Sequence, residues 1–174
     1  KHPDTAHLTL AVNVSALQFR DSDFVNSVAR AIAESGAPGS HLKLEITESL
    51  LLEDIGGTIE HIRPLKEKLG VGLVLDDFGT GYSSLSYLKQ LPLDQIKIDR
   101  SFVRDINSNP NDAAIAETII ALGHFFNLTI IAEGVETPAQ RDTLIICGCK
   151  AFQGFYFGKP GTIEQFQAGL GGNS

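Results

Sequence analysis

The chain has 174 residues, close to the ~150 of a typical domain, so we expect one domain over 1–174 and exclude a multidomain machine. Hydrophobic residues make up 43% and charged residues 20%, which disfavours intrinsic disorder, collagen-like and coiled-coil architectures. The net charge of -7 argues against duplex nucleic acid as the main partner, and no apolar run approaches the ~18 residues of a membrane span. We therefore expect a cytoplasmic globular domain with reduced cysteines.

Hydrophobic periodicity predicts strands and helices that alternate along the whole chain. Apolar residues recur at every second position in the predicted strands, and at every third or fourth position in the predicted helices. Pro64 falls inside the second helical stripe and predicts a kink there. The predicted strands cover 8–15, 42–46, 71–76, 95–100, 128–133 and 151–157. The predicted helices begin near 24, 55, 85, 109, 137 and 162.

This alternation predicts an α/β fold with a parallel sheet and right-handed crossovers, because no antiparallel hairpin signal separates the units. Two architectures remain open on that basis. An open doubly wound sheet fits the length, whereas a closed (β/α)8 barrel usually takes about 250 residues, about two units more than this chain provides.

The positions of polar residues favour the barrel. Six predicted strands carry a polar residue at or near the carboxyl end, opposite to the apolar residues of the same strand. A barrel rim gathers all such residues, whereas an open sheet scatters them over two faces and two edges. We therefore expect an incomplete (β/α)8 TIM-type barrel. The polar residues are Asn13, Glu45, Asp76, Lys97 with Asp99, Glu133 and Gln153.

The chemistry of these residues fits a hard divalent cation. Asn13, Glu45 and Asp76 offer only oxygen ligands, and the five histidines are scattered, so magnesium or manganese is indicated rather than structural zinc. Asp76 and the adjacent Asp77 could supply one ligand to each of two ions, or one ligand and one base, as in phosphodiester hydrolysis. A hydrated pair of acids at a turn is the simpler alternative.

Two further features have more than one interpretation. Lys97 among carboxylates could hold a water, neutralise a phosphate or form a buried salt bridge. The segment FGTGYSS at 78–84 lacks the lysine of a Walker loop, so we expect a hinged active-site loop in which Ser83 and Ser84 cap the next helix.

At this point six motifs resemble, in order and spacing, the EAL-domain family of cyclic-di-GMP phosphodiesterases. The resemblance covers nearly the whole chain and implies a modified (β/α)8 barrel that cleaves cyclic di-GMP to linear pGpG with magnesium or manganese. The motifs are NVS at 13–15, LEITES at 44–49, LDDFGTGYSSLSYL at 75–88, IKIDRSFV at 96–103, IIAEGVET at 130–137 and QGFYFGKP at 153–160.

The resemblance also implies roles for individual residues. Asn13, Glu45 and Asp76 match metal ligands, and Asp77 matches an acid that helps to hold a second ion. Glu48 matches a residue that anchors the glycine-rich loop, and Lys97 matches a lysine that orients the catalytic water. Glu133 matches a general base or a metal-site residue, and the matches on the substrate side are Glu136, Gln153 and Asp99.

One departure from the family is large. The Glu-Ala-Leu motif, whose glutamate is a metal ligand, does not occur, and the chain matches from about the third strand of the family. We therefore expect 1–174 to be a partial domain that lacks the first two strands and helices and is inactive alone. Exposed edges at 8–15 and 151–157 favour a homodimer or pairing with other segments. The resemblance also implies a parent in which sensor or GGDEF-type domains come first.

Two alternatives to a phosphodiesterase stay open. A receptor or regulatory module could bind cyclic di-GMP without hydrolysis. An aldolase-like barrel could use Lys97 to form a Schiff base with a carbonyl substrate, although the oxygen-ligand set disfavours it.

Overall fold

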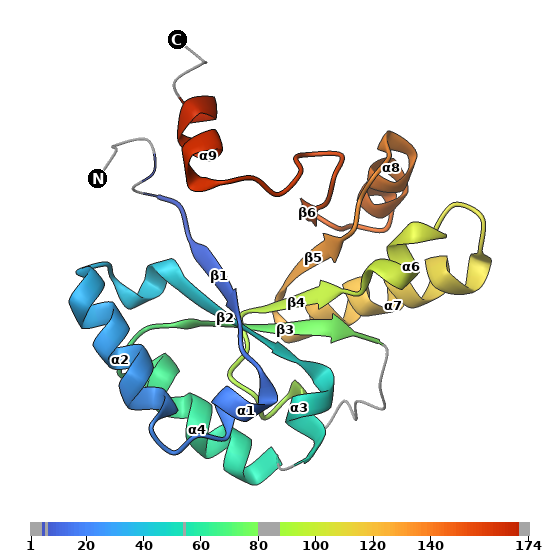
Figure 1. Ribbon diagram of the computed structural model, residues 1–174. Coiled ribbons are helices and arrows are strands. Elements are labelled where there is room, and N and C mark those ends of the chain that lie inside the picture. The colour runs from blue at the N-terminus through green and yellow to red at the C-terminus, as the bar shows by residue number, and fades with distance from the viewer. Residues whose placement is uncertain (1–4, 6, 54, 80–87, 171–174) are drawn as a thin grey trace.

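The computed structural model describes residues 5, 7–53, 55–79 and 88–170, and a six-stranded parallel sheet forms its centre. The spatial order of the strands follows the chain order from β1 to β6, and the sheet curls as a half-barrel (Figure 1). A doubly wound sheet reverses its strand order, so this one-way order confirms the incomplete TIM-type barrel. The strands are β1 (Leu10–Asn13), β2 (Leu42–Thr47), β3 (Gly72–Phe78), β4 (Gln95–Ile98), β5 (Thr129–Glu133) and β6 (Ala151–Gln153).

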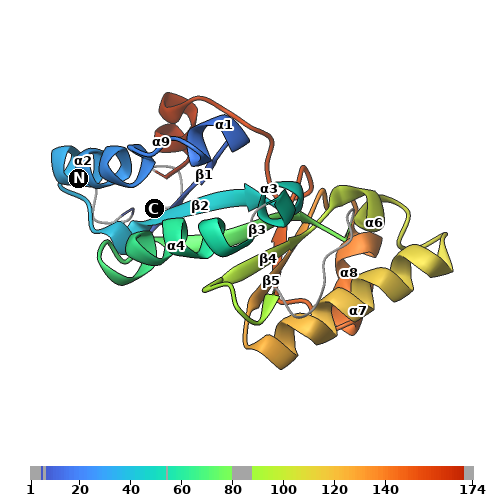
Figure 2. The same ribbon diagram turned by 90° about the horizontal axis from the view of Figure 1, so that it is seen from below.

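Helices cover the outer face of the curled sheet. Figure 2 shows α2 and α4 beside β2 and β3, while α7 packs against β4 and β5. None of the described helices combines the length and apolar character needed to cross a bilayer. The helices are α1 (Ala16–Phe19), α2 (Phe24–Ser35), α3 (Glu48–Glu53), α4 (Ile55–Glu67), α6 (Arg100–Arg104), α7 (Pro110–Phe126), α8 (Pro138–Ile146) and α9 (Ile163–Leu170), with a 3-10 turn η2 (Gly39–His41).

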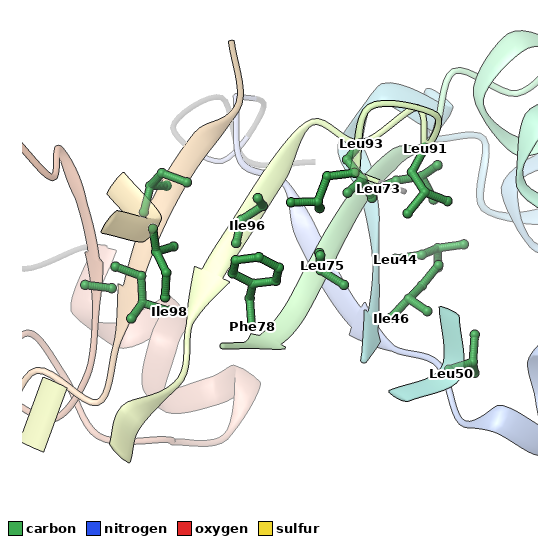
Figure 3. Packing of buried hydrophobic residues seen from close by; sticks show 14 of the residues in the cluster. Leu44, Ile46, Leu50, Leu73, Leu75, Phe78, Leu91, Leu93, Ile96 and Ile98 are labelled. Atoms are coloured by element: carbon green, nitrogen blue, oxygen red, sulfur yellow. The ribbon is translucent and has the colours of Figure 1, made fainter. Parts of the chain in front are cut away.

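The core lies between the sheet and these helices. Alternate residues of the central strands point to the helices, and each is at most 4% exposed, because the period of a strand is two. Figure 3 shows this layer, which includes Leu44, Ile46, Leu73, Leu75, Ile96 and Ile98. The residues between them point to the inside of the half-barrel, where the functional residues were expected.

The structure corrects several predicted boundaries. Strand β4 ends at Ile98 rather than at 100, because the Asp99 side chain accepts a hydrogen bond from the Ser101 amide and starts α6. Strand β6 ends at Gln153 rather than at 157, since Tyr156 donates back to the carbonyl of Val135. Pro64 lies inside α4, which runs from Ile55 to Glu67, and the kink expected at Pro64 stays a prediction. Cys147 and Cys149 form no disulfide in the described structure.

Candidate active site

The strand register brings the predicted polar residues to the inner face of the half-barrel. Partners in a parallel pair point to the same face, and Asn13 of β1 is the partner of Glu45 in β2. Glu133 of β5 is likewise the partner of Gln153 in β6. Asp76 and Lys97 have the same parity in β3 and β4, so residues from all six strands share this face.

Lys97 forms the centre of the site. Its side chain is 3% exposed, and Nζ lies 3.2 Å from Glu45 Oε2, 3.1 Å from Asp76 Oδ1 and 3.1 Å from Glu133 Oε2. Burial lowers the pKa of Lys97, but the carboxylates of Asp76, Glu45 and Glu133 outweigh burial and hold it above its ordinary value. Lys97 is therefore a charged ammonium. A Schiff base requires a neutral amine, so this environment disfavours the aldolase-like alternative.

A bulge in β3 places two adjacent acids at the site. The register shift between Leu75 and Phe78 inserts one extra residue opposite β4, and Asp77 adopts a φ of 54°. The extra residue returns Phe78 to the helix-facing core, where it is 5% exposed, and lets Asp76 and Asp77 both lie away from that core. Strict alternation would have directed Asp77 toward the helices. The bulge is therefore a feature that period-two reasoning missed.

Beside Lys97, a cavity of about 450 Å³ is lined by Asp77, Asp99, Arg100 and Glu133. Asp77 is exposed, but partial loss of its hydration raises its pKa, and the carboxylates of Asp76 and Asp99 raise it further. For Asp99, burial raises the pKa, but hydrogen bonds from the side chain and backbone of Ser101 outweigh burial and lower it overall. The sequence prediction included the three acids of this cavity and omitted Arg100, which it had assigned to a strand.

Glu48 connects the site to the glycine-rich segment. It begins α3 directly after β2 and is 2% exposed, and its Oε2 accepts a hydrogen bond from the Gly79 amide over 3.1 Å. Gly79 has a φ of +100°, and a Cβ there would lie 2.9 Å from the Phe102 ring, so glycine is required. The rest of the predicted loop, including Ser83 and Ser84, lies outside the described residues.

The other predicted residues lie at the periphery. Asn13 and Gln153 end the two outer strands of the described sheet, and both are exposed. Glu136 is also exposed and follows β5 in a connecting segment, where its amide donates to Gln140 Oε1 over 2.8 Å. The structure therefore brings Glu45, Asp76, Lys97 and Glu133 into contact. It places Asn13, Gln153 and Glu136 farther from this group.

Comparisons with known proteins are consistent with this geometry. The sequence profile described as "EAL domain" matches residues 1–160. This chain belongs to the EAL domain family. It is 46% identical over 165 residues to the bifunctional diguanylate cyclase/cyclic di-GMP phosphodiesterase MucR of Pseudomonas aeruginosa, covering 95% of this chain and 24% of MucR. This EAL chain thus spans about a quarter of that relative.

Solved structures of EAL proteins show the same arrangement of the chain. A c-di-GMP complex of the PaMucR phosphodiesterase superposes with a TM-score of 0.88 at 47% identity, over 91% of this chain and 64% of that chain. The manganese/cy-diGMP complex of Klebsiella pneumoniae BlrP1 gives a TM-score of 0.82 at 31% identity, over 91% of this chain and 40% of that chain, and its calcium/cy-diGMP complex gives the same values.

The donor chemistry of this EAL site fits a hard divalent cation. The carboxylates of Glu45, Asp76 and Asp77 and the amide of Asn13 provide oxygen donors, which magnesium and manganese prefer. Within the described residues, however, no three His, Cys, Asp or Glu side chains form a ready-made metal cluster. Lys97 lies between Glu45 and Asp76 and forms an ion pair with each, so a cation bound to these acids would share them with the ammonium.

Proposed function

We propose that this EAL domain hydrolyses cyclic di-GMP to linear pGpG in a reaction that depends on magnesium or manganese. The observation that carries the proposal is the buried group in which Lys97 contacts Glu45, Asp76 and Glu133 at the carboxyl ends of the strands. The names of the relatives support the substrate, because MucR is named a cyclic di-GMP phosphodiesterase and PaMucR was solved as a c-di-GMP complex.

In this proposal Asn13, Glu45, Asp76 and Asp77 hold the metal. Their oxygen donors are of the type that magnesium and manganese prefer, and the manganese in the BlrP1 complex supports the choice of ion. A metal ion supplies Lewis-acid polarisation of a phosphoryl group and lowers the pKa of water toward neutrality.

The remaining residues handle protons, charge and substrate. Hydrolysis forms a bond from a water oxygen to phosphorus and breaks the P–O3′ bond. Glu133 would accept the proton of the water as general base, and the released 3′ oxygen would take up a proton from solvent to become a hydroxyl. Lys97 keeps its positive charge and would orient that water, while Glu48 fixes the start of the glycine-rich loop through Gly79. The substrate-side residues in this assignment are Asp99, Glu136 and Gln153.

A receptor that binds cyclic di-GMP without cleaving it is the second candidate. The observation that favours a receptor is the position of Lys97, because its ammonium forms ion pairs with Glu45 and Asp76, which are two of the proposed metal ligands. One experiment distinguishes the phosphodiesterase from the receptor. The protein is prepared together with any residues that flank 1–174 in its gene and is incubated with cyclic di-GMP and Mn²⁺. Chromatography should show pGpG that disappears in EDTA and in Asp76→Asn. Tight binding without pGpG would instead identify a receptor.

The setting of the domain is part of the proposal. The printed name of MucR joins a cyclase to a phosphodiesterase, which supports a parent that also carries a cyclase (GGDEF-type) domain. A cytoplasmic location, a sensor domain and a position of these domains ahead of this one are proposed from the sequence alone. Exposed apolar residues on β1, Leu10 at 65% and Val12 at 40%, support pairing of the chain with a second copy or another segment.

A further inference from the structure

Arg100 is the only basic residue among the described residues that line the cavity beside Lys97. The other lining residues are the acids Asp77, Asp99 and Glu133, and Arg100 itself is exposed. We propose that Arg100 binds a phosphate of the cyclic dinucleotide, an inference that rests on the function proposed above.

The backbone holds the base of the Arg100 side chain in a fixed place. Arg100 is the first residue of α6, directly after Asp99, whose Oδ1 accepts a hydrogen bond from the Ser101 amide over 2.9 Å. On its other side, Gly134 follows Glu133 with a φ of +75°, and a Cβ at Gly134 would lie only 2.7 Å from the Arg100 Cβ. Glycine therefore permits the end of β5 to lie against Arg100, which lines the cavity together with Glu133.

Among the described residues, the guanidinium of Arg100 forms no ion pair with a carboxylate. Within the described residues, no ion pair of 4.0 Å or less involves Arg100, whereas Arg104 on the same helix pairs with Asp105. The nearby ammonium of Lys97 is buried and already contacts acids of three strands. Arg100 is thus the cation of the cavity that remains available to a ligand.

The charge of the cavity indicates a phosphate rather than a guanine base as the target. A phosphodiester that enters a cavity with three acids meets repulsion, and the guanidinium offsets part of it. Arginine also binds phosphate through two parallel N–H···O bonds, which are stronger than bonds between neutral groups. Arg100 is exposed and lines the cavity, whereas Lys97 is buried, so Arg100 is the more accessible of the two cations.

The test compares Arg100→Ala and Arg100→Lys with a matched control, Arg104→Ala, which removes an arginine that is paired with Asp105 and does not line the cavity. All measurements use the protein together with any residues that flank 1–174 in its gene. Calorimetry measures the Kd for cyclic di-GMP in Ca²⁺, the ion of one BlrP1 complex, at several NaCl concentrations. Thermal melts confirm that each variant is folded.

We expect Arg100→Ala to raise Kd about 10- to 100-fold, the range of a lost charged hydrogen bond, and to weaken the dependence of Kd on salt. Arg100→Lys should recover part of the affinity and the salt dependence, and Arg104→Ala should stay within about twofold of the wild type. If the wild type binds cyclic di-GMP tightly and the Kd of Arg100→Ala lies within twofold of the wild-type Kd, this inference alone is overturned. Weaker binding by Arg100→Ala with an unchanged salt dependence also overturns it and indicates base recognition. A wild type that binds no cyclic di-GMP overturns the proposed function and this inference together.

Discussion

Lys97 on β4 contacts Glu45 on β2, with 3.2 Å between Nζ and Oε2, although β3 lies between the two strands. The curl of the sheet brings the inner faces of non-adjacent strands together, which a flat sheet would not do. Three carboxylates from β2, β3 and β5 thus surround one buried ammonium.

Removing that ammonium should destabilise the protein. Lys97→Met leaves Glu45 and Asp76 buried without their partner, and we expect the free energy of unfolding to fall by about 3 to 5 kcal/mol in EDTA. Urea unfolding measures the loss. Added Mn²⁺ should restore part of the stability, because a cation can neutralise the same acids.

The matched control for this loss is Lys43→Met, on the same inner face at the other end of β2. Lys43 is half-buried, and we expect its replacement to cost less than about 1 kcal/mol. Equal losses in Lys97→Met and Lys43→Met would contradict a specific role of Lys97 in neutralising the site.

Metal ligands and the general base should respond differently to neutral substitutions. Glu45→Gln and Asp76→Asn should weaken Mn²⁺ binding by at least about tenfold, because each removes a charged donor. Glu133→Gln should keep Mn²⁺ binding and slow turnover by about 100- to 10,000-fold, the cost of losing a general base. Calorimetric Mn²⁺ titration beside the turnover number checks both. If Glu133→Gln loses the metal as completely as Asp76→Asn does, Glu133 must be counted as a ligand.

Asp77 should make stability depend on pH. The pKa of Asp77 in the folded protein lies above the ordinary value of 3.8. The contribution of Asp77 to the free energy of unfolding is therefore complete below about pH 3.8 and is lost as the pH rises through the pKa of the folded state. Asp77→Asn removes this loss, and asparagine tolerates the φ of 54°. Near neutral pH in EDTA we expect a gain of less than about 1 kcal/mol, because Asp77 is exposed.

Urea unfolding at about pH 4 and about pH 7 measures this effect. Asp142→Asn is the control because Asp142 is exposed and pairs only with the half-buried Arg141 in the described structure. Asp77→Asn should have its advantage at the higher pH and none at the lower. An advantage that is equal at both values would mean that repulsion among the acids of the site is not its cause.

Residues 1–174 alone should self-associate. A groove of about 990 Å³ runs over the outer side of β1 between α2 and α9, and its lining includes Leu10, Val12, Phe24 and Phe166. Light scattering should show a mass above that of one chain that increases with concentration, and Leu10→Lys should reduce it. A monomer at all concentrations would show that this apolar surface is tolerated in water.

The sequence predicted the order of the strands and the shared face of Asn13, Glu45, Asp76, Lys97, Glu133 and Gln153, because period-two alternation and parallel register together determine which face a residue occupies. It named Asp77 beside Asp76 as a metal-site residue but did not predict the bulge that lets both acids lie away from the core, since a bulge adds a residue without a distinct local signal in the sequence. It also assigned Arg100 to a strand, because the five-residue helix α6 is too short to show a helical period.

Sequence patterns also could not identify the partners of Lys97. The sequence allowed a salt bridge, a water or a phosphate as its partner, and the structure shows ion pairs with three carboxylates. Residues 45, 76, 97 and 133 are far apart in the chain, and the predicted barrel rim gathered them on one side without giving the distances between their side chains. Short-range patterns contain no information on such distances.

The most direct test of the central claim follows the oxygen that hydrolysis adds. The protein, with any residues that flank 1–174 in its gene, is incubated with cyclic di-GMP and Mn²⁺ in H₂¹⁸O, and the product is analysed by mass spectrometry. The account predicts linear pGpG with one ¹⁸O on its 5′ phosphate, formed only with the divalent cation and absent in Asp76→Asn. Unlabelled pGpG, labelled pGpG formed in EDTA, or no pGpG at all would contradict metal-dependent hydrolysis by this site.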